Sequence, residues 1–146
     1  MIEKYFIDYK NKYHEMKKAL KRYLDATQDF YTLTGIKLDD MPKTKGKALG
    51  LDDLLANIEQ LNLEYIARNK EYQEERNKCK KDIDKLENPI YRTIIEYTYL
   101  NFENNKEIAK SLKEYHNKDY TLGYLRILKS KAISKFEKMI TKNNLI

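Results

Sequence analysis

A long heptad seam at the start of the chain is the feature that most limits how this sequence can fold. Apolar and aromatic residues recur at alternating steps of four and three for about four heptads, with Lys, Glu and Asp between them. The seam residues are Ile2, Phe6, Tyr9, Tyr13, Met16, Leu20, Tyr23, Thr27 and Phe30. Because a helix with one narrow apolar stripe is marginal alone, we expect a partner helix to cover this seam.

A second long helix is predicted from about Leu51, and it supplies that partner. Its seam consists of Leu51, Leu54, Ile58, Leu61, Tyr65, Tyr72, Cys79, Ile83 and Leu86. Arg68 and Glu75 fall where apolar residues are expected, so the seam is weak over residues 66–80. We therefore expect an antiparallel, coiled-coil-like helical hairpin over residues 1–87. The weak stretch would extend beyond the partner helix or contact a second subunit, and pairing within one chain or between two stays open.

The segment between these two helices has the composition of a connection. Residues 34–50 contain three of the four glycines of the chain, together with Pro42 and the closely spaced Lys43, Lys45 and Lys47. Gly and Pro are the strongest local signals for turns and loops. A long connection without structure of its own is either functional or disordered, so we expect residues 34–50 to form a partly mobile loop.

Three further helices are predicted after residue 87. Asn88 is suited to cap a helix that begins at Pro89 and runs to about Phe102. Asn104 and Glu107 have the spacing of a capping box for a short helix that ends near Tyr115. A last helix follows over roughly 121–140. The fold class predicted is all-α, with a trihelical helix-turn-helix domain at residues 88–146 after the hairpin.

The last helix is amphipathic and basic. At 100° per residue, one face holds Leu122, Leu125, Leu128, Ala132, Phe136, Met139 and Ile140. An α-helix fits the major groove of DNA, and basic side chains on its flanks neutralise phosphates. The candidate DNA-binding residues are Thr121, Tyr124, Arg126, Ile127, Ser130, Lys131, Ser134, Lys135 and Lys138. Lys129 falls at the edge of the apolar face.

The net charge supports an anionic partner. The chain has a formal net charge of +6, of which residues 1–88 carry +1 and residues 89–146 carry +5. An excess of Lys and Arg confined to one module is typical of proteins that bind nucleic acid. The alternative interpretation is that Lys-rich helices only present solvated faces.

Other classes of function lack their usual sequence patterns. His14 and His116 are far apart and Cys79 is the only cysteine, so we expect no metal site, no catalytic residues, no cofactor and no enzyme activity. No apolar run approaches the ~20 residues of a membrane span, and the N-terminus lacks the apolar core of a signal peptide. We therefore expect no membrane partner, and the single cysteine favours a location in a reducing cytoplasm.

From Glu107-Ile108-Ala109 to Lys131-Ala132-Ile133-Ser134-Lys135-Phe136, the C-terminal part resembles region 4 of bacterial sigma factors. With Asp40-Met41-Pro42-Lys43 and Leu86-Glu87-Asn88-Pro89-Ile90-Tyr91-Arg92 in addition, the whole chain resembles phage-encoded transcriptional regulators of the ArpU/RinA type. This resemblance implies a regulator that binds double-stranded DNA through its last helix in the cytoplasm of a bacterial host. Its N-terminal helices would form a homodimer or contact RNA polymerase.

The sequence departs from the sigma pattern at the start of the last helix. The connection Lys113 to Tyr120 is several residues longer, and Leu122-Gly123-Tyr124 replaces the polar residues that often read bases. Arg126 is retained. The pattern therefore favours phosphate contact by the lysines, with Tyr124 and Ile127 touching thymine methyl groups. Alternatively these two residues pack against a partner helix, and the chain is a helical protein-interaction factor, an adaptor or an inhibitor, without a DNA role.

Overall fold

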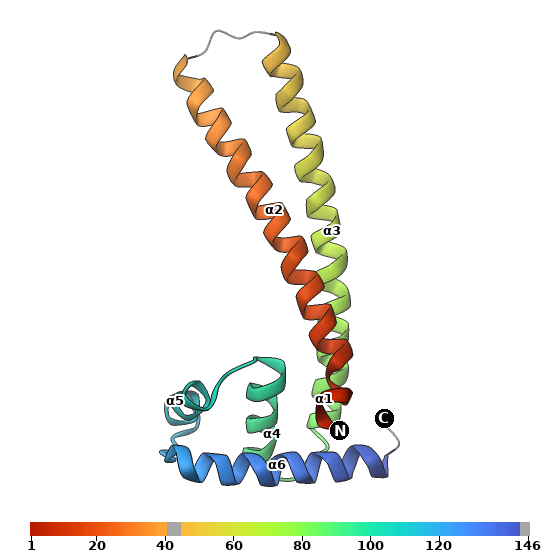
Figure 1. Ribbon diagram of the computed structural model, residues 1–146, viewed down its shortest axis with the longest axis vertical. Coiled ribbons are helices and arrows are strands. Elements are labelled where there is room, and N and C mark those ends of the chain that lie inside the picture. The colour runs from red at the N-terminus through yellow and green to blue at the C-terminus, as the bar shows by residue number, and fades with distance from the viewer. Residues whose placement is uncertain (41–44, 144–146) are drawn as a thin grey trace. The chain divides into compact units, whose positions relative to one another are not determined.

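Helices account for the regular structure of this protein. The computed structural model describes residues 1–40 and 45–143, and the side chains of residues 1–32 and 50–143. In chain order the elements are α1 (Ile2–Tyr5), α2 (Ile7–Asp40), α3 (Lys45–Ile83), α4 (Pro89–Ile95), the π-helical turn η1 (Glu96–Leu100), α5 (Asn105–His116) and α6 (Leu122–Lys142) (Figure 1). No β-strand occurs within these ranges, so the predicted all-α class is confirmed.

The chain divides into two compact units, at positions that differ from the expected boundary at residue 87. We call Asn11–Gln73 the two-helix unit. The core unit consists of Met1–Lys10 and the described residues from Glu74 onward. Both ends of the predicted hairpin thus belong with the C-terminal helices. At the N-terminal end the reason is that α1 packs against α6, and the rings of Tyr5 and Phe6 contact Phe136 of that helix.

Within the two-helix unit, α2 and α3 contact each other in antiparallel order. The Arg22 guanidinium lies 3.1 Å from the Glu64 carboxylate, and the rings of Tyr23 and Tyr65 stack 6.5 Å apart. Farther along, the Lys12 ammonium lies 3.3 Å from the carboxylate of Glu71. Residue numbers therefore fall on α3 as they rise on α2, as an antiparallel pair requires.

Within the two-helix unit, residues 68–72 of the weak part of the second seam pack against α2 instead of extending beyond it, and contact of the weak part with a second subunit stays a prediction. The Arg68 guanidinium donates to the Glu71 carboxylate at 3.3 Å, and Glu71 also pairs with Lys12 of α2. Tyr72 is buried, and its ring lies 5.7 Å from that of Tyr13. Ion pairs and aromatic rings, which a search for aliphatic periodicity undervalues, therefore join this stretch to α2.

The connection between α2 and α3 is shorter than the expected loop over residues 34–50. The backbone is helical to Asp40 and again from Lys45, so Gly35, Gly46 and Gly50 all lie within helices. A glycine in a helix interior costs about 1 kcal/mol relative to Ala, and this cost alone does not end a long helix. Residues 41–44, which include most of the Asp40-Met41-Pro42-Lys43 motif, lie outside the described residues.

The caps predicted for the C-terminal helices are present. The Asn88 side chain accepts a hydrogen bond from the backbone N–H of Ile90 at 2.9 Å, at the start of α4. Asn104 and Glu107 form the predicted capping box of α5, with both hydrogen bonds between 2.9 and 3.0 Å. The predicted α-helix from Pro89 to about Phe102 was wrong in its second half. The α-helix ends at Ile95, and the π-helical turn η1 follows it to Leu100.

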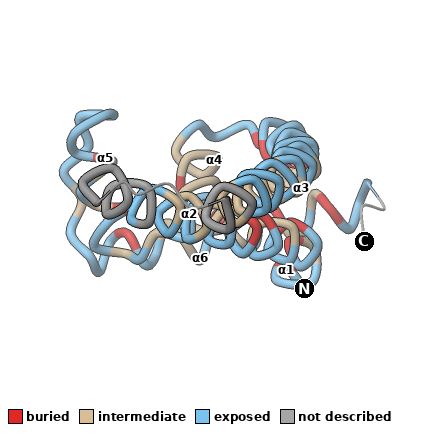
Figure 2. The backbone as a smooth tube through the Cα atoms, turned by 90° about the horizontal axis from the view of Figure 1, so that it is seen from above, coloured by how far each residue is buried: buried red, intermediate tan, exposed pale blue. Residues whose placement is uncertain are grey.

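The first ten residues are part of the core unit. Ile2, Phe6 and Tyr9 are buried, and α1 packs on α6 together with α4 and α5. The Phe6 ring stacks against Phe136 of α6 at 5.6 Å and against Tyr99 of η1 at 4.9 Å. Figure 2 shows the buried stretches in red. Sequence-distant aromatic residues thus hold the apolar face of α6 in place.

A polar network fixes the end of η1. The buried Tyr9 hydroxyl donates to the backbone carbonyl of Leu100 at 2.6 Å and accepts from the Arg76 guanidinium at 3.0 Å. Arg76 also donates to the Asn101 side chain at 2.9 Å. Phe102 follows with a φ of 55°, a conformation that side-chain-bearing residues seldom adopt. This network satisfies backbone groups that the π-helical turn leaves unpaired and directs the chain toward α5.

Burial raises the pKa of several groups in the core unit, among them Cys79 and Tyr99. Burial, with smaller effects of the neighbouring carboxylates Glu75 and Asp82, raises the pKa of the Cys79 thiol from 9.0 to about 12. Burial is also the main reason why the pKa of Tyr99 rises to about 12. In both cases the folded protein favours the neutral form, because the low-dielectric interior penalises charge.

We predict that the free energy of unfolding decreases at alkaline pH. A group whose pKa is raised in the folded state stabilises the fold fully at pH values below its pKa in the unfolded state. This stabilisation is lost as the pH rises toward the pKa of the group in the folded state. For Cys79 this window runs from about pH 9 to about pH 12, and the loss by pH 10 is about 1 kcal/mol. Urea titrations at pH 8 and pH 10 measure it. Cys79→Ala should reduce the difference in the free energy of unfolding between pH 8 and pH 10. An unchanged difference would contradict the assignment of this pH dependence to Cys79.

Candidate nucleic-acid interface

A threonine cap begins α6 as predicted. Thr121 has extended backbone angles, and its hydroxyl oxygen accepts a hydrogen bond from the backbone N–H of Tyr124 at 3.1 Å. This bond satisfies one of the N–H groups that the first helical turn leaves unpaired. The helix then continues through 21 residues to Lys142, two residues beyond the predicted end at Ile140.

One face of α6 is fully covered by the rest of the core unit. Leu125, Ala132, Phe136 and Ile140 are each 0 % exposed, which agrees with the predicted apolar face. Leu128 and Met139 of that face are half-buried, and Leu122 is 36 % exposed at the first position of the helix. Four fully buried residues over four turns fix the rotation of α6 about its axis, so the opposite face points to solvent.

The nine predicted DNA-binding residues all lie on the exposed side of α6 or at its cap. Each of them is exposed, from Thr121 to Lys138. At 100° per residue they divide into two flanks. Arg126, Ser130 and Ser134 lie along one flank, and Tyr124 lies along the other with Lys131, Lys135 and Lys138.

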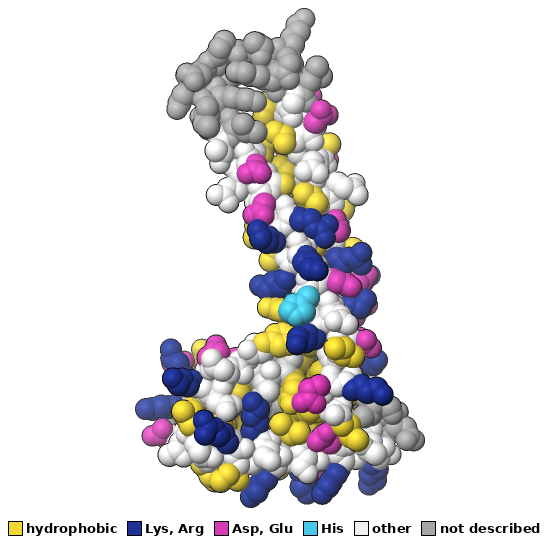
Figure 3. Space-filling model, in the orientation of Figure 1, with side chains coloured by type: hydrophobic (Ala, Val, Ile, Leu, Met, Phe, Trp, Pro, Cys, Tyr) yellow, Lys and Arg dark blue, Asp and Glu magenta, His cyan; other side chains and the backbone are white. Residues whose placement is uncertain are grey.

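Sequence reasoning missed one member of the second flank. Lys142 is exposed and continues the spacing i, i+4, i+7, i+11 that starts at Lys131. It was missed because the helix was predicted to end at Ile140. We call Lys131, Lys135, Lys138 and Lys142 the lysine flank. It occupies an arc of about 60° and extends for about 16 Å along the helix axis. Basic side chains gather along α6 in the space-filling view (Figure 3).

The lysine flank has no counter-charge close by. Among the residues that the structure describes, no carboxylate oxygen lies within 4.0 Å of these four ammonium groups. The α6 helix carries six Lys or Arg residues and one acidic residue, Glu137. Charges that are neither paired internally nor buried remain available to an external anion, with an attraction that salt weakens.

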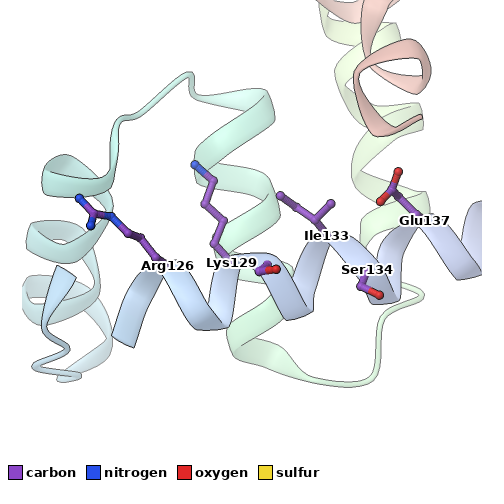
Figure 4. Close-up of a pocket in the computed structure, with 6 residues that line it drawn as sticks. Arg126, Lys129, Ile133, Ser134 and Glu137 are labelled. Carbon is purple, nitrogen blue, oxygen red and sulfur yellow. The ribbon is translucent and has the colours of Figure 1, made fainter. Parts of the chain in front are cut away.

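The other flank of α6 is less suited to bind an anion. Figure 4 shows Arg126, Lys129, Ile133 and Glu137 projecting to one side of the helix, whereas Ser134 projects away from them. Lys129 is half-buried and donates to the Asn105 side chain of α5 at 3.2 Å. The sequence places Lys129 at the edge of the apolar face of the last helix. In the structure its side chain is held toward α5 by the contact with Asn105. A shallow depression on this side of α6 is lined by Arg126, Lys129 and Glu137, among others. The Glu137 carboxylate reduces the positive charge of this depression.

The start of α6 is exposed and apolar. Tyr124 and Ile127 are 47 % and 53 % exposed, and the Tyr124 ring meets the edge of Tyr120 at 5.1 Å. No described helix of this chain covers them. At Gly123 an added Cβ would have no neighbouring atom within 4 Å. Packing within the chain therefore does not require glycine at this position.

The comparisons with known proteins give no relative. No family model, curated protein or solved structure among those compared matches this chain. The resemblances to sigma region 4 and to ArpU/RinA-type regulators therefore stay predictions. None of the described helices is both long enough and apolar enough to cross a membrane.

Proposed function

We propose that this protein is a DNA-binding transcriptional regulator of a phage or prophage, of the ArpU/RinA type. In this proposal α4, α5 and α6 act as a helix-turn-helix domain, and α6 docks in the major groove. The observation that carries the proposal is the lysine flank, whose four ammonium groups are exposed and lack a nearby carboxylate within the described part of the chain. Phosphate contacts of this kind supply most of the affinity of such proteins for DNA.

The start of α6 supports a close approach of the duplex. Residues near the start of a recognition helix are those that reach base edges. Gly123 lets the backbone come near a partner, and the exposed Tyr124 and Ile127 side chains are suited to contact thymine methyl groups. Arg126, the one guanidinium of α6, lies on the other flank. We therefore expect affinity to come mainly from phosphates and sequence preference to come from few contacts.

The two-helix unit has features that support self-association. Leu24 and Leu63, which adjoin the Tyr23–Tyr65 stack, are 52 % and 64 % exposed. Tyr31 and Ile66 are also exposed. On α2, the seam residues after Met16 are only half-buried, namely Leu20, Tyr23, Thr27 and Phe30. We propose that this unit forms a homodimer or contacts RNA polymerase. A dimer would place two copies of α6 on half-sites about one helical turn apart.

Charge reversal on α6 tests the DNA proposal. The triple variant Arg126→Glu, Lys131→Glu, Lys135→Glu should lose duplex binding, because it replaces phosphate contacts with repulsion. The matched control is Lys10→Glu, Lys18→Glu, Lys70→Glu, which makes the same change in net charge at exposed positions of α2 and α3. A gel-shift titration with the DNA upstream of the gene measures both. Equal behaviour of the two variants would contradict docking through α6.

A second candidate function is a helical protein-interaction factor without DNA binding. The exposed apolar residues Leu122, Tyr124 and Ile127 at the start of α6 favour it, since such side chains also fit a protein surface. The same charge-reversal experiment separates the two functions. In the second case, wild type and both triple variants would all leave the duplex unbound.

We predict that the protein has twice the mass of its 17.6 kDa chain in solution. Leu24→Glu with Leu63→Glu should give the monomer, because the added carboxylates oppose burial of this surface. Gln28→Glu with Gln60→Glu adds the same charge at exposed polar positions and should leave the dimer intact. Sedimentation equilibrium measures the mass. A monomeric wild type would rule out the homodimer and leave RNA polymerase contact as the proposed role of this unit.

A further inference from the structure

A groove in the core unit lies between the lysine flank and a segment far from it in sequence. It has a volume of about 620 Å³ and is lined on one side by residues 85–88 and Tyr91, around the start of α4. The other side is the C-terminal half of α6, with Lys135, Lys138, Met139 and Lys142. Leu86 and Met139 supply apolar surface. No single helix could form this site, because one wall comes from the α3–α4 connection and the other from α6.

The charge of the groove is strongly one-sided. Four lysines line it, Lys85 being the fourth, against the single carboxylate of Glu87. Lys85 lies 3.2 Å from the Asp82 carboxylate, whereas the three lysines of α6 have no carboxylate within 4.0 Å in the described ranges. Ammonium groups gathered around one groove repel each other. The attraction of each of them to an anion placed between them offsets that repulsion. The groove is therefore electrostatically suited to hold an anion.

The other lining groups fit a phosphate in particular. Tyr and Asn side chains are among the groups that donate hydrogen bonds to phosphate oxygens in protein–DNA complexes, and Tyr91 and Asn88 line this groove. The lysine flank leads into it, since Lys135, Lys138 and Lys142 belong to both. An extended polyanion lying along the flank would thus meet Lys85 and the start of α4 near its end.

We propose that this groove binds the sugar-phosphate backbone of one DNA strand, and that Lys85 and Lys142 contact its phosphates. The inference rests on the proposed DNA-binding function and extends it, because it adds a contact from outside α6. The contact is to phosphate and not to bases. It should therefore contribute equally to duplexes of different sequence and depend strongly on salt.

The test is the salt dependence of duplex binding by the full chain. For Lys85→Gln with Lys142→Gln, the slope of log affinity against log salt should fall in magnitude by about 0.9 for each phosphate that the variant no longer neutralises. Two duplexes of unrelated sequence should be weakened by the same factor in affinity. Lys142→Gln alone should give about half of the slope change. That single variant avoids any effect of disturbing the Lys85–Asp82 pair on folding. Lys18→Gln with Lys70→Gln is the matched control and should keep the wild-type slope.

The possible failures of this test are distinguishable. If wild type binds duplex and the Lys85/Lys142 variant keeps its slope, the groove inference is overturned and the proposed function stands. Weakening confined to one of the two duplexes would also overturn it, because it would indicate base contact. If wild type fails to bind either duplex, the proposed function itself is wrong and the inference falls with it.

Discussion

The stacking of Phe6 between Phe136 and Tyr99 is the contact on which the core unit depends. A helix with one apolar face has no fixed rotation until that face is covered, and α4 and α5 are too short to cover all of α6. The N-terminal aromatic residues cover the remainder. Because burial of Leu125, Phe136 and their neighbours fixes the rotation of α6, it also decides that the lysine flank faces solvent. Packing and surface charge are therefore two consequences of one amphipathic sequence.

Local signals in the sequence predicted most of the elements. Asn88, Asn104 and Thr121 cap helices where expected, since capping depends on residues within one turn. The exposed side of α6 followed from its periodicity for the same reason. What sequence could not predict depends on distant contacts. The inclusion of residues 1–10 in the core unit, the π-helical turn and the pairing of Glu71 with Lys12 of α2 all arise from packing. The groove beside Lys85 likewise needs the folded chain, because periodicity on α6 carries no information about residue 85.

The arrangement of charge bears on how this protein would recognise DNA. The lysine flank of α6 carries four unpaired ammonium groups, whereas the leading residues of the helix are apolar and Arg126, on the other flank, is the one guanidinium of α6. Lysine is a flexible point charge, and it lacks the planar fork with which arginine reads guanine. A protein built in this way would bind strongly to the backbone and discriminate weakly among sequences. Two copies held together would then raise selectivity through the spacing of half-sites.

The salt dependence of wild-type affinity for a duplex tests the central claim most directly. Contact with about five phosphates per module predicts that log affinity falls with log salt at a slope near −4.5. Fluorescence anisotropy of a labelled duplex between about 50 and 200 mM KCl measures this slope over the range where counterion release is well resolved. A steep fall would support docking through the lysine flank. Binding that does not change with salt, or no binding at 50 mM KCl, would contradict it.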